Sequence, residues 1–419
     1  MARLVLRPTV GFTLVGFMFA AAAALHSAAA GDWPQWRGAG RDGVSTEKGL
    51  LAAWPAGGPK FLWKTTGLGK GFGSVSVRGD RIYTTGEGAE HSRVLALNVA
   101  NGNILWTSPP LGKKGGDPVG PQASPAVDEQ GVYVLSQFGD VVCFEAATGK
   151  ERWRRSLVKD FGGTAPSWEY SESLLLDGDK IVCTPGGGRG AVVALNKHDG
   201  RTLWQSKDFK DPAHHSSLIA ATIDGVRQYI QLTAQSVAGV DARTGALLWR
   251  APRHGDTAVV PTPIYADHHV YVTSGYNNGC NLFAVRKTGN RFTVKQVYAK
   301  DRISNHHGGV VKVGGYVYGH CNSGRWICQE FLTGRIVWEH KGVGKGSVVY
   351  ADGHLYCRGE DRKGTVALVA ATPEGYVEKG RFDQPDRSRE QAWAHPVVAG
   401  GRLYLRDQDI LLCYDVRAR

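Results

Sequence analysis

The chain has 419 residues, a formal net charge of +12 and 56 glycines. This length exceeds what one compact core usually holds, but a radial repeat permits it because each unit packs only on its neighbours. The basic residues are dispersed, and the chain contains no known nucleic-acid motif, so the sequence predicts no nucleic-acid partner.

Residues 1–30 have the features of a secretory signal peptide. Arg3 and Arg7 precede the apolar run 10–25, and an A-x-A pattern ends at Ala30. The alternative is an uncleaved membrane anchor, but the run is short for a spanning helix of ~20 residues. We therefore expect a secreted or periplasmic protein of the cell envelope, with no transmembrane segment after cleavage and an N-terminal extension over 31–57.

A β-hairpin phrase recurs after residue 57, most clearly over 192–204 (VVALNKHDGRTLW). Alternating apolar residues, a turn with glycine and a second alternating run predict two antiparallel strands. In every full copy, glycine stands four residues before tryptophan, and Asn, Asp or Glu stands four residues before glycine. The five full copies span 94–106, 141–153, 192–204, 237–249 and 326–338.

Weaker copies complete a ring of repeats. Residues 282–297 and 366–380 keep the position but lose the tryptophan, and a half-copy over 410–416 ends the repeats. Two more β-rich segments precede each hairpin, which makes four strands in each of eight units. The segment 61–66 (FLWKTT) places Trp63 where the repeat tryptophan belongs. The sequence predicts an all-β protein, an eight-bladed β-propeller over 58–416, closed by this N-terminal strand in the last blade.

The cysteine count is seven, with no adjacent pair and no C-x-x-C. Aligning the repeats puts Cys143 and Cys328 in the slot that Ala194 holds, so we expect them to be small buried residues. The alternative for one pair is a disulfide between Cys321 and Cys328, which flank one turn, in an oxidising compartment.

The hairpins resemble the pyrroloquinoline quinone (PQQ)-type propeller repeat, which quinoprotein alcohol dehydrogenases share with BamB-like propellers. Residues 32–45 (DWPQWRGAGRDGVS), 168–188 and 400–416 also resemble secreted PQQ-like repeat proteins of planctomycete-type bacteria. The resemblance implies that outer-strand tryptophans dock between neighbouring blades. The tryptophans in that position are Trp63, Trp106, Trp153, Trp204, Trp249 and Trp338.

Two functions compete. The favoured hypothesis is a monomeric binding or scaffold module of the cell envelope, without bound PQQ, whose partner is an envelope protein, a peptide or a glycan. The alternative is a PQQ-dependent dehydrogenase that uses PQQ and Ca²⁺ to oxidise an alcohol or a sugar. The chain departs from the second pattern because it lacks a vicinal cysteine pair, an Asp-rich calcium loop and the greater length of those enzymes. We predict no metal site.

The candidate site is the mouth of the axial channel. Loops that enter the innermost strands, and loops that join the second and third strands, share one face of a propeller. Histidines concentrate in the entering loops; the alternative role for them is to cap turns and bond neighbouring backbone. Because adjacent strand residues point to opposite faces, we expect at most one of each His–His pair to line the channel. The candidates are Trp168, Glu169, His214, His215, His306, His307, Arg389 and His395.

Overall fold

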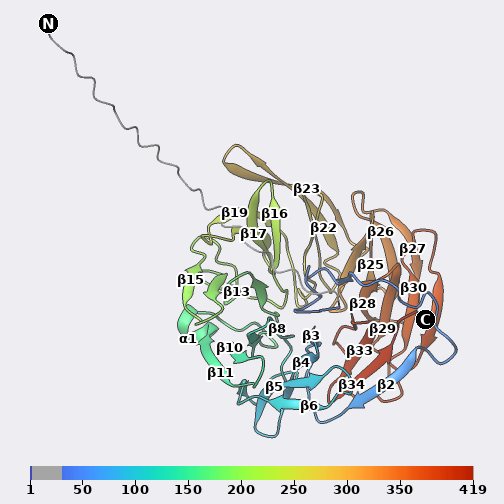
Figure 1. The fold of residues 1–419 in the computed structure, drawn as a ribbon. Helices are drawn as coiled ribbons and strands as arrows, with labels where there is room; N and C mark the ends of the chain where they lie inside the picture. Colours follow the sequence, from blue (N-terminus) through green and yellow to red (C-terminus); the bar gives the residue numbers. More distant parts are fainter. Residues whose placement is uncertain (2–30, 419) are drawn as a thin grey trace.

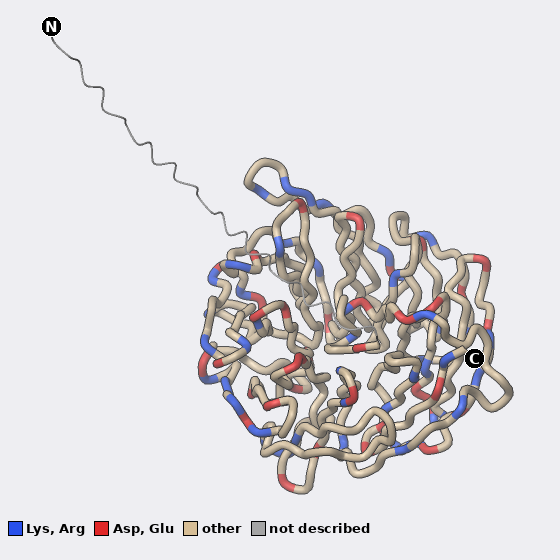
Figure 2. Tube along the Cα trace, in the orientation of Figure 1, with Lys and Arg blue, Asp and Glu red and all other residues tan. Residues whose placement is uncertain are grey.

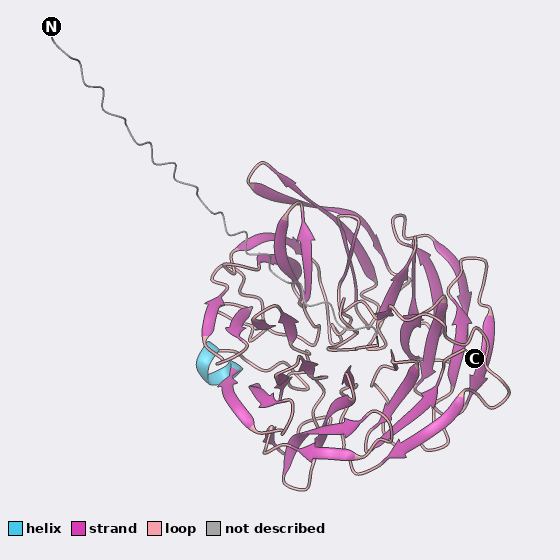
Figure 3. Cartoon of the chain, viewed as in Figure 1, coloured by secondary structure: helices cyan, strands magenta, loops and turns pink. Residues whose placement is uncertain are grey.

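The computed structural model describes Met1 and residues 31–418, so the predicted signal peptide lies largely outside the described residues. Strands dominate the described part of the chain, and its one helix is the short α1 (Leu157–Phe161) (Figure 3). Glycine-rich turns and short alternating runs account for this, because neither supports helical periodicity. The all-β prediction is confirmed.

Eight sheets form a closed ring around a central axis (Figure 1). From the axis outward, blades one to four are β3 (Ser76–Arg78), β4 (Arg81–Glu87), β5 (His91–Asn98) and β6 (Ile104–Thr107); β8 (Ala126–Val127), β9 (Gly131–Leu135), β10 (Asp140–Glu145) and β11 (Glu151–Ser156); β12 (Leu175–Asp177), β13 (Lys180–Cys183), β14 (Val193–Asn196) and β15 (Thr202–Gln205); and β16 (Ile219–Ile223), β17 (Val226–Leu232), β18 (Ser236–Asp241) and β19 (Leu247–Pro252).

Blades five to eight follow the same order: β20 (Ile264–Ala266), β21 (His269–Thr273), β22 (Cys280–Thr288) and β23 (Arg291–Lys300); β24 (Val310–Val313), β25 (Tyr316–Cys321), β26 (Arg325–Glu330) and β27 (Ile336–His340); β28 (Gly346–Ala351), β29 (His354–Gly359), β30 (Val366–Ala370) and β31 (Glu378–Phe382); and β32 (Val397–Ala399), β33 (Arg402–Asp407), β34 (Ile410–Asp415) and β2 (Lys60–Thr65). Two short strands join these sheets: β7 (Gly112–Lys113) beside β5, and β1 (Val44–Ser45) parallel to β28.

The ring closes as the sequence predicts. Strand β2 pairs antiparallel with β34, and Trp63 lies opposite Cys413 in that pairing. The first strand of the propeller is thus the outer strand of the last blade. Closure leaves no free edge between the first and last blades, which is how propellers avoid exposing a strand that invites aggregation.

Each outer strand pair has the same irregularity. The repeat tryptophan lies opposite a small residue, as in Ala194 opposite Trp204 and Cys143 opposite Trp153, and the register shifts directly after that pair. The small partner leaves room for the indole, and the bulge bends the outer strand at the same point of every blade. This position explains the pattern of alanine, glycine and cysteine across the repeats.

Most repeat tryptophans contact the next blade through its hairpin turn. The Trp204 indole lies over Gly245, where an added Cβ would stand 2.4 Å from the ring, and its Nε1–H donates to the Ala242 carbonyl at 3.3 Å. Trp249 differs: its Nε1–H donates to Gln228 of its own blade. The longer β22–β23 hairpin of blade five has its turn glycine at Gly289, where an added Cβ would meet nothing within 4 Å. The Trp249 side chain still packs in a cluster that joins blades four and five.

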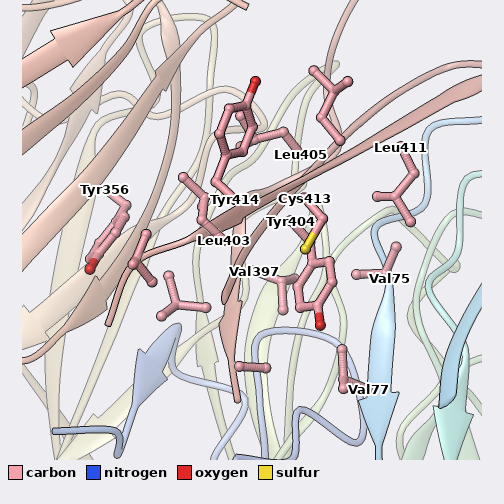
Figure 4. Packing of buried hydrophobic residues seen from close by; sticks show 14 of the residues in the cluster. Val75, Val77, Tyr356, Val397, Leu403, Tyr404, Leu405, Leu411, Cys413 and Tyr414 are labelled. Carbon is pink, nitrogen blue, oxygen red and sulfur yellow. The ribbon is translucent and has the colours of Figure 1, made fainter. Parts of the chain in front are cut away.

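Apolar clusters fill the spaces between blades. The largest joins blades seven, eight and one and includes Tyr356, Tyr404 and Leu411 (Figure 4). All seven cysteines are buried and free, including Cys321 and Cys328. Lysine and arginine are scattered over the ring, with a run along the projecting β22–β23 hairpin (Figure 2). Among the described residues, no helix has the length and apolar character needed to cross a membrane.

Candidate functional site

The N-terminal extension crosses the centre of the ring (Figure 1). It enters beside the turn after β3 and leaves beside the end of β28, which lie on the same face of the propeller. On entry, Asp32 accepts the N–H of Gly79 in the turn after β3, and Trp33 exchanges both backbone hydrogen bonds with Val77. On exit, β1 runs beside the innermost strand β28. Residues 33–45 therefore form a hairpin plug inside the ring, a role that the sequence did not reveal.

Two buried arginines fasten this plug. Arg41 donates from Nε to the Leu218 carbonyl at 2.7 Å, and from its two Nη atoms to the Leu174 and Ser173 carbonyls at 2.8 Å each. Arg37 donates to the carbonyls of Asp42 and Val310. Burial lowers the pKa of Arg41 to about 9, so it stays charged at neutral pH. The plug thereby satisfies backbone carbonyls that face the axis, which otherwise need water.

Trp36 stands at the tip of the plug. Its Nε1–H donates to the Thr262 hydroxyl at 2.9 Å, which joins the tip to blade five. Its ring packs on His395 of blade eight, with ring centroids 4.5 Å apart. His395 Nε2 lies 2.8 Å from the carbonyl oxygen of His307, so the His395 ring carries its proton on Nε2. The tip is held from two sides of the ring.

Above Trp36 the channel opens into a cavity of about 550 Å³. Entering loops of every blade except the seventh contribute to it, together with the loop between β21 and β22 and the turn between β33 and β34. Its volume lies in the range of small-molecule sites. The lining residues are Trp36, Lys70, Phe72, Asp117, Pro118, Val119, Gln122, Trp168, Ser171, Ser173, His215, Ser217, Thr257, Ala258, Val260, Tyr276, His306, His307, Glu390, Gln391, Trp393 and Gln408.

Aromatic rings run continuously along one side of this cavity. Tyr276 meets His306 edge-on at 5.2 Å, and His306 lies 4.5 Å from His307. His307 lies 4.9 Å from Trp393, whose ring lies 4.7 Å from Phe72. This side of the cavity is therefore mostly flat ring surface that packs well against apolar faces of a ligand.

Serine hydroxyls form part of the wall on the opposite blades. The Ser124 N–H donates to the Ser173 hydroxyl at 2.9 Å, and the Ser173 N–H donates to the Ser217 hydroxyl at 3.0 Å. The same bond, at 2.8 Å, joins Ser74 to Ser124, so equivalent positions of four successive blades are linked. Within the described part of the chain, the hydroxyls of Ser173 and Ser217 accept but donate to no other residue, which leaves both O–H groups for a ligand.

The histidines at the cavity are neutral at physiological pH. Burial lowers the pKa of His215 to about 3 and that of His306 to about 4, where Lys345 adds to the effect. Burial also lowers the pKa of His307, which is enclosed by other cationic and imidazole groups. Lys345 Nζ donates to His306 Nδ1 at 2.8 Å, so His306 carries its proton on Nε2.

The eight predicted site residues divide into two groups. Trp168, His215, His306 and His307 line the cavity, whereas His395 lies behind Trp36, below the floor. The other three lie outside the lining. His214 packs edge-on against His215, Glu169 accepts the Asp117 N–H at 3.1 Å, and Arg389 is exposed beside Glu390.

One expectation about the paired histidines is wrong. We expected at most one of each pair to line the channel, but His306 and His307 both do. They lie in a bend before β24 and not in a strand, so the alternation of strand side chains does not apply. Sequence reasoning also missed Trp36 and Phe72. The motif DWPQWRGAGRDGVS around Trp36 was the available signal, since it sits outside the repeats.

A comparison with protein families matches residues 90–340 to the model described as outer membrane protein assembly factor BamB. That match covers more than half of the chain. The chain belongs to the BamB family. Two curated relatives show the range of this group. The polyvinylalcohol dehydrogenase of a Sphingopyxis species is 25% identical over 53% of this chain and 39% of its own, and BamB of Yersinia pestis is 23% identical over 52% and 55%. The chain spans about half or less of the length of these relatives.

Solved structures of BamB-family and quinoprotein propellers share the fold. BamB from Moraxella catarrhalis superposes with a TM-score of 0.59 at 16% identity, over 83% of this chain and 95% of that one. The quinohemoprotein alcohol dehydrogenase of Comamonas testosteroni gives 0.58 at 13% identity, over 93% and 81%. At these identities the likeness of the three chains concerns the fold alone.

The residues of this BamB-family cavity do not fit PQQ with Ca²⁺. Calcium needs six to eight oxygen ligands, with carboxylates among them. No cluster of three His, Cys, Asp or Glu suited to a metal occurs among the described residues. PQQ carries several carboxylates, whereas the charged lining groups are Asp117, Glu390 and Lys70, and Lys70 is already paired with Glu390 at 3.1 Å. The charge of the lining thus opposes this anion.

Proposed function

We propose that this BamB-family propeller is an exported binding module of the cell envelope, and that it takes its ligand at the channel-mouth cavity. The plugged channel carries the proposal. Because residues 33–45 fill the axis from the opposite face, the channel is a cup with a Trp36 floor. A closed-ended cavity of about 550 Å³ has the size of a small-molecule site.

The rim supports a binding role independently. Trp168 and Tyr276 are large aromatic residues that are 44% and 51% exposed, and each lies in a turn at the edge of the cavity. Exposed aromatic side chains around a pocket typically mark binding surfaces. Two relatives are named outer membrane protein assembly factors, and residues 1–30 have the features of a signal peptide, which supports an envelope partner for this chain.

Site-specific photo-crosslinking in cells tests this function. A photo-reactive residue at Asn277, beside Tyr276 on the rim, should capture an envelope component. The same residue at Leu332, which is exposed in the turn between β26 and β27 on the opposite face, is the matched control. Equal labelling from both positions, or a protein found in the cytoplasm with its first thirty residues intact, would refute the proposal.

A further inference from the structure

We propose that the ligand of the channel-mouth cavity is a neutral carbohydrate, an uncharged stretch of glycan; this rests on the proposed function. Sugars present two chemically different surfaces. The faces of a pyranose ring expose C–H groups that pack on aromatic rings, and the edges expose hydroxyls that both donate and accept hydrogen bonds. The cavity offers both kinds of partner at once.

The aromatic surfaces stand where a sugar ring would enter. Trp168 precedes blade three and Tyr276 belongs to blade five, so the two rim rings approach the mouth from different blades. Both adopt left-handed backbone conformations, with φ of 64° and 57°. Such angles are uncommon outside glycine and cluster where function demands them. Trp393 and Phe72 continue the aromatic surface inward from the rim.

The polar groups that line the cavity include both donors and acceptors of hydrogen bonds, as the hydroxyl groups at the edge of a sugar require. Ser173 and Ser217 have free O–H donors. Gln122 uses its Nε2 to bind the Trp168 carbonyl at 2.8 Å, which leaves its Oε1 as an acceptor. Asp117 lines the cavity and is in no ion pair with another described residue, so its carboxylate accepts from hydroxyls without charge competition. These groups bind a polyol by hydrogen bonds alone.

The electrostatics favour an uncharged ligand over an anionic one, because Asp117 is the charged lining group left without an ion pair among the described residues. Lys70 and Glu390 neutralise each other, and Lys345 behind His306 lies 3.6 Å from Glu360. The neutral imidazoles of His215 and His306 present flat, uncharged rings to the cavity. A peptide strand would need a row of free backbone partners, yet the inner strands are paired with their neighbours in each sheet and bonded to the plug at several points.

Calorimetry and tryptophan fluorescence with the exported, processed protein test this. The probes are neutral hexasaccharides of glucose, mannose and N-acetylglucosamine in α and β linkages, and the neutral glycan fraction of the host envelope; oligogalacturonate and an aromatic pentapeptide serve as comparison ligands. At least one neutral probe should bind. Trp168→Ala and Tyr276→Ala should each weaken that binding by about tenfold.

Controls separate the site from the fold. Trp168→Phe keeps an aromatic face and should retain most of the affinity, and Asp117→Asn should weaken binding without lowering the melting temperature. Leu332→Ala, on the opposite face, should change neither. Failure of every neutral probe at about 10 mM overturns the carbohydrate assignment. So does binding that survives Trp168→Ala and Tyr276→Ala. If the pentapeptide binds instead and the photo-reactive residue at Asn277 still crosslinks, the protein is a binding module but its ligand is not a carbohydrate. If the residue at Asn277 captures nothing, the proposed function itself is wrong.

Discussion

Replacing Arg41 by methionine should detach the plug from blades three and four. The guanidinium donates to three backbone carbonyls, those of Leu218, Leu174 and Ser173, at 2.7–2.8 Å. Arg41 itself is 1% exposed, so water does not replace these bonds without opening the ring. At a lower figure of about 1 kcal/mol for each buried carbonyl left unpaired, the free energy of unfolding falls by about 3 kcal/mol.

This loss is measurable by calorimetry at pH 7. With an unfolding entropy of about 2.1 cal/mol/K per residue, a change of 1 kcal/mol shifts the melting temperature of a propeller this large by about 1–1.5 °C, so Arg41→Met should melt about 3–5 °C lower. Arg41→Lys keeps the charge but lacks the planar guanidinium, so its melting temperature should lie between those of the parent protein and Arg41→Met. The matched control is Arg201→Met, whose side chain is 67% exposed. An Arg41→Met protein that melts within about 1 °C of the parent would show that the plug does not stabilise the ring.

The remaining predictions concern the blades and the buried titratable groups. Trp204→Ala should lower the free energy of unfolding by about 3 kcal/mol. Gly245→Ala should destabilise as well, since the φ of Gly245 is 75° and an added Cβ would meet the Trp204 ring; an unchanged melting temperature in either would contradict the docking role. Burial lowers the pKa of His215 and His395 to about 3, below the unfolded value near 6.5. The contribution of these two histidines to stability is therefore full above pH 6.5 and declines toward pH 3, by about 2 kcal/mol per histidine at pH 5; melting followed against pH should show this decline, and His395→Gln should reduce it. The seven cysteines should resist a thiol reagent in the native protein and react in denaturant; a disulfide in non-reducing mass spectrometry would contradict the free thiols.

Blade number and closure were predictable because their signals are local. The hairpin phrase carries its own turn glycine, its alternating apolar faces and its tryptophan within thirteen residues, as over 192–204. Repetition of a unit that cannot bury its faces alone then requires neighbours, and an orphan outer strand at 61–66 supplies the closure. The pairing of Trp63 with Cys413 follows from this pattern.

The site was only partly predictable, because it depends on contacts between residues far apart in the chain. Which loops reach the mouth follows from propeller topology, and four of the eight candidates do line the cavity. The loops have no strand alternation, so the directions of His306 and His307 depend on their neighbours in the folded ring. The extension has no repeat period to place it. Arg41 donates to carbonyls that are 132, 133 and 177 residues away in the sequence, and only the closed ring brings them around one guanidinium. The same closure lets the extension block one end of the axial channel, which makes the other end a cavity.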